Sequence, residues 1–173
     1  NAAGEMDHLS SIPIDGYRGL NIHWIDDNAF FSKGSHGELA LISLQDGILW
    51  NIDEEQLASL IEIEGVISLA PTFRLEVSAD GVAFLLGSFT LETFERRAFI
   101  AQVSQTGEVS NVVVRDNARS VSLKQFLDDG YLLQWLEYTD TDTSQKVLQK
   151  ISWNGDIELE QTINSQKGLA LAT

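Results

Sequence analysis

The sequence predicts an all-β fold made of three similar units, each a four-stranded antiparallel sheet. Apolar and polar residues alternate along most of the chain, glycine turns divide it, and the intervals between turns repeat. Each unit has an acidic turn followed about 20 to 26 residues later by a second polar turn. The pairs are Asp27-Asn28 with Asp46-Gly47, Asp80-Gly81 with Thr106-Gly107, and Asp129-Gly130 with Asn154-Gly155.

The spacing of these turns matches the blade of a β-propeller. The first turns, at residues 27, 80 and 129, recur after 53 and 49 residues, and the second turns recur after 60 and 48. One four-stranded sheet in about 40 to 50 residues is the repeat of such proteins. Closed propellers usually carry about four to eight blades, so three units predict a partial or truncated β-propeller.

The segment before the first unit, residues 1–18, is polar and punctuated by Pro13 and Gly16, and we expect it to lead into the fold without packing as an element. The first blade should span about 19–65. Leu20, Ile22 and Trp24 alternate with polar neighbours in its first strand, and further strands follow at 29–32, 38–44 and 48–52.

One short helix is expected near residues 54–61. Asp53 can cap it, Gln56 stands at the third helical position, and Leu57, Leu60 and Ile61 share one helical face. An irregular outer strand is the competing interpretation, because ten residues are few for a helix without tertiary support.

The second and third blades should span about 66–115 and 119–163. Val82 to Phe89 is the most apolar stretch of the second blade and predicts an inner strand. Residues 168–173 resemble the opening strand at 19–22 and predict the start of a further blade within a domain of 19–173. At the turns, we expect glycine or asparagine to adopt positive φ while the aspartate bonds to nearby backbone N–H groups.

The charge of the chain excludes some partners. It has 26 acidic residues against 11 Lys and Arg, a net charge of −15, and 43% apolar residues in 173, enough for a substantial core. This field repels nucleic acid and anionic lipid, so we expect neither nucleic-acid binding nor direct membrane contact by this segment. An acidic surface also keeps sheet edges from associating.

Cysteine is absent, which excludes disulfides, thiolate metal ligands and a cysteine nucleophile but does not fix the compartment. The longest apolar stretches are far shorter than the twenty or so residues of a membrane helix. The chain opens at Asn1-Ala2 without an initiator methionine or signal peptide, and we expect it to be an excised part of a larger protein.

The first repeat resembles the WD40-like propeller repeat of TolB type. The resemblance lies in the polar-aromatic strand 19–24, the turn at Asp26-Asp27-Asn28, the polar loop 34–37 and the apolar strand that ends at Asp46-Gly47. It extends to Ser78-Ala79-Asp80-Gly81 and 127–130, and so covers roughly residues 19–163. The proline of the family's Ser-Pro-Asp-Gly turn is missing in all three repeats.

The resemblance implies protein interaction or ligand sensing outside the cytoplasm. One context similar to such a segment is the C-terminal sensor region of membrane-anchored regulators of CadC or ToxR type, and it implies a periplasmic or extracytoplasmic location. Three blades leave inner faces uncovered. The array is therefore either truncated, which we favour, or completed by a second copy in a homodimer.

The best candidates for a binding surface are Trp24, His23 and Trp135. Tryptophans at strand positions usually pack within the fold, so a platform for a sugar or peptide needs one exposed ring, and Trp24 is the first choice. We place His23 at an exposed position of its strand, between Ile22 and Trp24.

No catalytic or metal site is predicted, and no cofactor. His8, His23 and His36 lie in different segments, whereas zinc needs converging ligands. Ser35, His36 and Asp46 lack the strained turn that presents a nucleophile, and 138–144 lacks the glycine and distal glutamate of a calcium loop.

We therefore expect a non-catalytic module that binds a protein or a small-molecule ligand. The alternative is the propeller portion of a hydrolase whose catalytic residues lie outside this segment, and a third interpretation is a purely structural spacer between domains.

Overall fold

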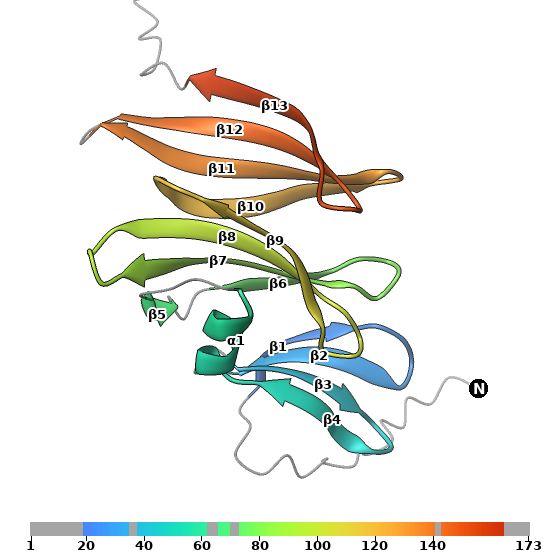
Figure 1. Cartoon of the computed structure of the whole chain (residues 1–173). Helices are drawn as coiled ribbons and strands as arrows, with labels where there is room; N and C mark the ends of the chain where they lie inside the picture. Colours follow the sequence, from blue (N-terminus) through green and yellow to red (C-terminus); the bar gives the residue numbers. More distant parts are fainter. Residues whose placement is uncertain (1–18, 35–37, 62–65, 70–72, 141–142, 165–173) are drawn as a thin grey trace, which may run out of the picture.

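The computed structural model describes residues 19–34, 38–61, 66–69, 73–140 and 143–164, and the predicted segments 1–18 and 168–173 lie outside them. The fold is all-β, as predicted: three antiparallel sheets follow one another in chain order, from the N-terminal sheet at the bottom of Figure 1 to the C-terminal sheet at the top. Within the described residues, no helix is long and apolar enough to cross a bilayer.

The first sheet is a four-stranded meander. Its strands pair in chain order, and their bounds are β1 (Gly19–Trp24), β2 (Ala29–Gly34), β3 (Leu39–Ser43) and β4 (Gly47–Ile52). All four fall where the alternation of apolar residues predicts them. Strand β3 is buried throughout. Leu39 and Leu41 belong to the apolar cluster shared with the second sheet, and Ala40 and Ile42 form a small cluster with Phe30 on the other face.

A short helix follows the first sheet, as predicted. Helix α1 (Glu54–Leu60) begins with a capping box, in which the Asp53 carboxylate accepts from the backbone N–H of Gln56 and the Gln56 side chain accepts from that of Asp53. Leu57 and Ile61 are buried, but Leu60 is 45% exposed and does not share their face. The irregular strand considered as an alternative is thus wrong.

The second sheet has five strands rather than the predicted four. Both β5 and β6 pair with β7, at different ends of that long strand, so two short segments share the first position of the sheet. The bounds are β5 (Val66–Leu69), β6 (Arg74–Val77), β7 (Ala83–Leu91), β8 (Arg96–Val103) and β9 (Val109–Arg115).

The third sheet is again a four-stranded meander and has the longest strands. They are β10 (Ala118–Leu127), β11 (Gly130–Asp140), β12 (Thr143–Ser152) and β13 (Ile157–Asn164). In the described chain, β10 pairs with β11 alone, so its other edge carries no partner strand.

The middle sheet is packed on both faces. One face, with Leu85, Phe99 and Ala101, joins the first sheet and α1 in a single apolar cluster. The other face, with Phe84 and Ile100, forms a second cluster with the third sheet. Opposite residues of an antiparallel pair share a face, so this division follows directly from the alternation along β7 and β8.

The outer faces of the two end sheets carry exposed apolar side chains. On the first sheet these include Ile22, Trp24 and Ile48, and on the third sheet Leu159 and Ile163, all between 40% and 56% exposed. Among the described residues, no further sheet covers either face. In the described part of the chain, both end sheets therefore carry exposed apolar side chains on their outer faces.

The turns use glycine for two different reasons. Gly47, Gly81, Gly107 and Gly155 have positive φ, as predicted. Gly130 does not; a Cβ there would collide with the backbone of Ile151, so close approach of two strands excludes a side chain. Positive φ is also absent at Asn28.

The turn at Asn28 is held instead by a side chain. The Asp26 carboxylate accepts from the backbone N–H groups of Asn28 and Ala29 at 2.7 and 2.8 Å. This is an Asx turn, in which the aspartate replaces a backbone acceptor. An aspartate therefore holds this turn, as expected, but it is Asp26 and not Asp27 of the Asp27-Asn28 pair.

Candidate functional site

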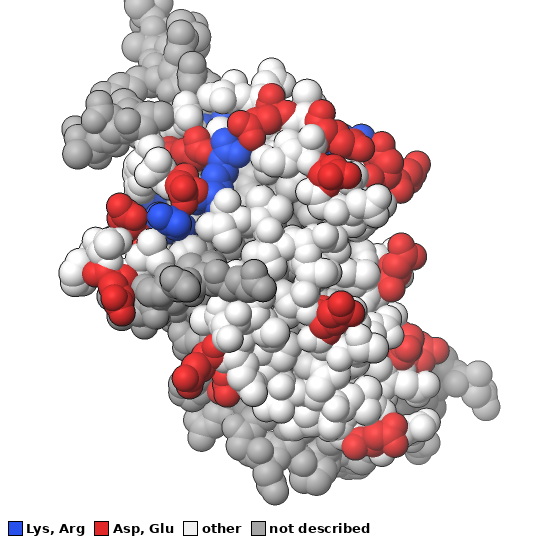
Figure 2. Space-filling view, in the orientation of Figure 1, with Lys and Arg blue, Asp and Glu red and all other residues white. Residues whose placement is uncertain are grey.

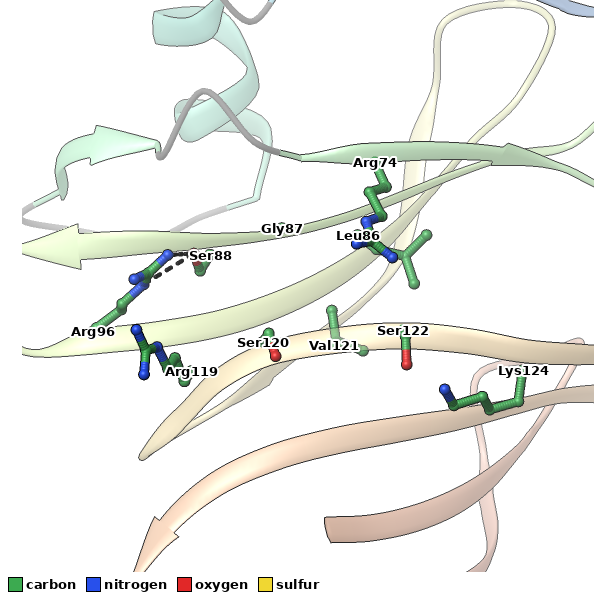
Figure 3. A pocket seen from close by; sticks show the side chains of 10 residues that line it. All are labelled: Arg74, Leu86, Gly87, Ser88, Arg96, Arg119, Ser120, Val121, Ser122 and Lys124. Atoms are coloured by element: carbon green, nitrogen blue, oxygen red, sulfur yellow. Dashed lines mark hydrogen bonds between the residues drawn. The ribbon is translucent and has the colours of Figure 1, made fainter. Parts of the chain in front are cut away.

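A basic cleft lies between the second and third sheets (Figure 3). Its volume is about 400 Å³, and its walls come from β6, β7 and β8 on one side and from β10 on the other. Four cationic side chains line it, namely Arg74, Arg96, Arg119 and Lys124, together with the hydroxyls of three serines, Ser88, Ser120 and Ser122.

The register of the second sheet places two of these cations on one face. Arg74 of β6 stands opposite Leu86 of β7, and Arg96 of β8 stands opposite Thr90 of the same strand. Leu86 belongs to the apolar cluster shared with the third sheet, so this face of β7 looks toward that sheet. Both arginines are therefore directed to the side of the sheet where β10 lies.

The two cations on β10 stand where its pairing with β11 is interrupted. The register shifts between Ala118 and Ser120 and again between Leu123 and Gln125, which leaves Arg119 and Lys124 without an opposite residue. An extra residue in a strand re-aims side chains, and such bulges are frequent next to functional sites. Both bulged residues of this strand line the cleft.

None of the described residues that line the cleft is acidic. Of the 11 Lys and Arg, Arg18 and Lys167 lie outside the described residues, so four of the nine described basic residues gather here. Within the described chain these four form no ion pair, whereas Arg97, Arg115 and Lys150 each pair with two carboxylates. On the face shown in Figure 2, acidic side chains are spread widely, while basic ones gather near the third sheet.

Two of the four cations are held in place by neighbours. The Arg96 guanidinium donates from Nε and Nη2 to the Ser88 hydroxyl, at 3.1 and 2.8 Å. Arg119 donates to the Tyr138 hydroxyl and lies over that ring, 5.4 Å from its centroid. Both guanidinium groups are thus oriented before any ligand arrives, and each keeps further N–H donors.

A network of charges also joins the second and third sheets. Arg115 of β9 pairs with Glu137 of β11 and with Glu160 of β13, where Nη1 and Nη2 donate to the two carboxylate oxygens at 2.8 and 3.2 Å. The hydrogen bonds that Arg115 donates to Glu160 and Glu137 raise the pKa of Arg115, and its guanidinium lowers the pKa of Glu160. Arg115 therefore stays charged and is fully engaged, unlike the four cations of the cleft.

Trp135 does not lie at the surface. Its side chain is fully buried, and its indole Nε1 donates to the Gln149 side chain at 2.9 Å. Arg115 covers its ring at 5.9 Å from the centroid. The prediction of a surface role for Trp135 is wrong because β11 turns this position toward the middle sheet.

The first two candidates, Trp24 and His23, occupy opposite faces of β1. Trp24 is 54% exposed and packs on Phe30, with ring centroids 4.9 Å apart. His23 stands opposite Phe31 of the buried face and is half-buried, so its predicted exposed position is wrong. The two side chains therefore cannot form one site, and Trp24 remains available on the outer face of the first sheet.

The metal and catalytic constellations weighed from the sequence are mostly not described. His8, Ser35 and His36 lie outside the described residues, as do 141–142 of the 138–144 loop. Among the residues that the structure does describe, no three His, Asp or Glu side chains are grouped as metal ligands.

The basic cleft was missed in the sequence because its residues come from four strands. One local signal was present: residues 117–127 contain Arg119 and Lys124 but no acidic residue, in a chain with 26 acids. Comparison with models of protein families, with curated proteins and with solved structures found no match.

Proposed function

We propose that the protein is a non-catalytic binding module that senses an anionic ligand in its basic cleft. The observation that carries this proposal is the gathering of Arg74, Arg96, Arg119 and Lys124 around one hollow without a carboxylate among the described lining residues. Like charges held close together repel, and a bound anion removes that cost. In a chain of net charge −15, acidic neighbours would be the ordinary means of compensation.

The residues of the cleft suit binding better than catalysis. Arginine keeps its proton at all ordinary pH values and cannot act as a general base. The serine hydroxyls have no histidine or carboxylate among the described lining residues to activate them. What the cleft offers is a set of forked N–H donors and hydroxyls, which match the oxygens of a carboxylate or phosphate.

The placement of the cleft supports a propeller-type sensor. In a propeller the first strands of the blades surround a central channel, and the cleft lies where β10, the first strand of the third sheet, meets β6, β7 and β8 of the middle sheet. With the TolB-type resemblance of the repeats, this favours an extracytoplasmic sensor region, as in regulators of CadC or ToxR type.

The exposed apolar outer faces favour a second candidate property, the pairing of two copies. The outer face of the first sheet of one copy would pack on the outer face of the third sheet of the other, and a two-fold axis would form this contact twice. Six sheets would then close a ring within the usual range of four to eight. Sedimentation equilibrium should give a dimer that Trp24→Lys converts to a monomer, whereas a monomeric parent protein would exclude this pairing.

Anion binding is tested by isothermal titration calorimetry, in which citrate is titrated into the intact chain at low salt. Arg119→Gln should weaken binding at least fivefold, while Lys146→Gln, an exposed cation outside the cleft with the same change of charge, should leave it within twofold. Equal effects of the two variants, or no binding by the parent, would overturn the proposed site. Turnover of ester or glycoside substrates by this chain would overturn the non-catalytic assignment.

A further inference from the structure

The cations of the cleft form two separate groups. Along β7, the positions opposite Arg74 and Arg96 are four residues apart, which corresponds to about 13 Å of strand. On β10, Arg119 and Lys124 are five residues apart, or about 16 Å. In Figure 3, Arg96 and Arg119 lie at one end of the cleft, and Arg74 and Lys124 lie toward the other.

The stretch between the two ends is not charged. Between the ends the cleft is lined by Gly87 of β7 and by Val121 of β10, which belongs to the apolar cluster between the sheets. Ser120 and Ser122 add hydroxyls on β10. A ligand that lies along the cleft thus meets cations at its ends and apolar or hydroxyl groups along its middle.

The two ends also differ in how firmly they are built. Ser88 holds Arg96, and Tyr138 holds Arg119. At the other end, Arg74 and Lys124 have no hydrogen-bond acceptor or carboxylate among the described residues. One end therefore presents guanidinium forks held by hydrogen bonds, and the other presents cations on long side chains without such a bond to a described residue.

We infer that the ligand is an elongated dianion of the dicarboxylate class, with one carboxylate on Arg96 and Arg119 and the other on Arg74 and Lys124. This inference rests on the proposed function and narrows it. On the β7 side the Arg96 guanidinium bonds to Ser88, two strand residues from Leu86, so the anionic groups there should be separated by roughly 7 Å. Arg119 and Lys124 start about 16 Å apart on β10, so their long side chains have to lean toward each other to reach the same two groups. This separation of the two anionic groups is the scale of a medium-length aliphatic dicarboxylate such as adipate, and one carboxylate alone would leave one end uncompensated.

The test compares adipate with hexanoate, which has the same carbon chain and a single carboxylate, by calorimetric titration of the intact chain at low salt. Adipate should bind at least tenfold more tightly than hexanoate. Arg74→Gln should lower the affinity for adipate toward that for hexanoate and leave hexanoate binding within twofold. Arg96→Gln should weaken both ligands, and Lys146→Gln should weaken neither.

The outcomes separate this inference from the proposal on which it rests. If hexanoate binds as tightly as adipate, or if Arg74→Gln leaves adipate binding unchanged, the two-ended ligand is overturned while anion binding stands. If citrate, adipate and hexanoate all fail to bind the folded parent chain, the proposed function itself is overturned. Circular dichroism and the melting temperature of each variant show that a loss of binding is not a loss of fold.

Discussion

Arg115 is expected to stabilise the junction between the second and third sheets, and Arg115→Met should show how much. The substitution removes the guanidinium, including its place over the Trp135 ring, and leaves an unbranched apolar side chain. Glu137, whose side chain is only 11% exposed, would then keep one described donor, the amide of Gln145 at 2.8 Å. Glu160 would be affected less, because its side chain is 44% exposed.

The magnitude follows from this difference in burial. Removing one partner of a buried ion pair typically costs about 3–5 kcal/mol, and we expect about 3 kcal/mol for Arg115→Met because Gln145 still donates to the carboxylate. Glu160→Gln should cost below about 1 kcal/mol, as for an exposed pair. The double variant Arg115→Met with Glu137→Leu should return to within about 1 kcal/mol of the parent, because no buried charge is left unpaired.

Urea denaturation followed by tryptophan fluorescence measures the three free energies of unfolding. The reasoning is refuted if Arg115→Met costs no more than Glu160→Gln. It is also refuted if the double variant is as unstable as Arg115→Met alone, because the loss would then come from packing and not from the stranded carboxylate.

Further predictions concern turns and acid. Ser104→Ala removes a hydroxyl that accepts from the backbone N–H of Glu108 at 3.2 Å, and should cost about 1 kcal/mol in urea denaturation. Gly130→Ala should cost about 3 kcal/mol or more because its Cβ meets the backbone of Ile151; a cost below that of a surface substitution would contradict this. The pKa of Glu160 is held below its ordinary value of 4.5 by its guanidinium partner, so the stability that it contributes is present above pH 4.5 and lost as the pH falls through the lowered pKa. Glu160→Gln should flatten that part of a stability profile measured by urea denaturation.

Local signals in the sequence were sufficient to predict where the helix begins and where most strands lie. The capping pair Asp53 and Gln56 acts within four residues, so the start of α1 could be predicted from the sequence alone. The apolar alternation likewise located the strands. The features that were not predicted depend on how distant strands pair. Strands β5 and β6 share one position of the second sheet because both pair with β7, and the local sequence does not determine that pairing.

The candidate site was harder to predict for the same reason. The direction of Trp135 depends on which face of β11 meets the middle sheet, and alternation alone leaves both faces open. Arg119 and Lys124 stand at bulges, where the alternation that guides a sequence interpretation is interrupted. Arg74 lies 45 residues before Arg119 in the chain, and only the packing of two sheets brings them to one cleft.

The serial arrangement of the sheets has a consequence for how the protein comes apart. Stability in such an array is a sum of contributions from each unit and from its contacts with direct neighbours. The middle sheet has two neighbours and each end sheet has one among the described residues. Local opening should therefore begin at the ends, and backbone amides of β7 and β8 should exchange with deuterium last. A ligand bound in the basic cleft would contact both the middle and the third sheet and so stabilise their packing. Its binding should therefore slow the hydrogen exchange of backbone amides in β10.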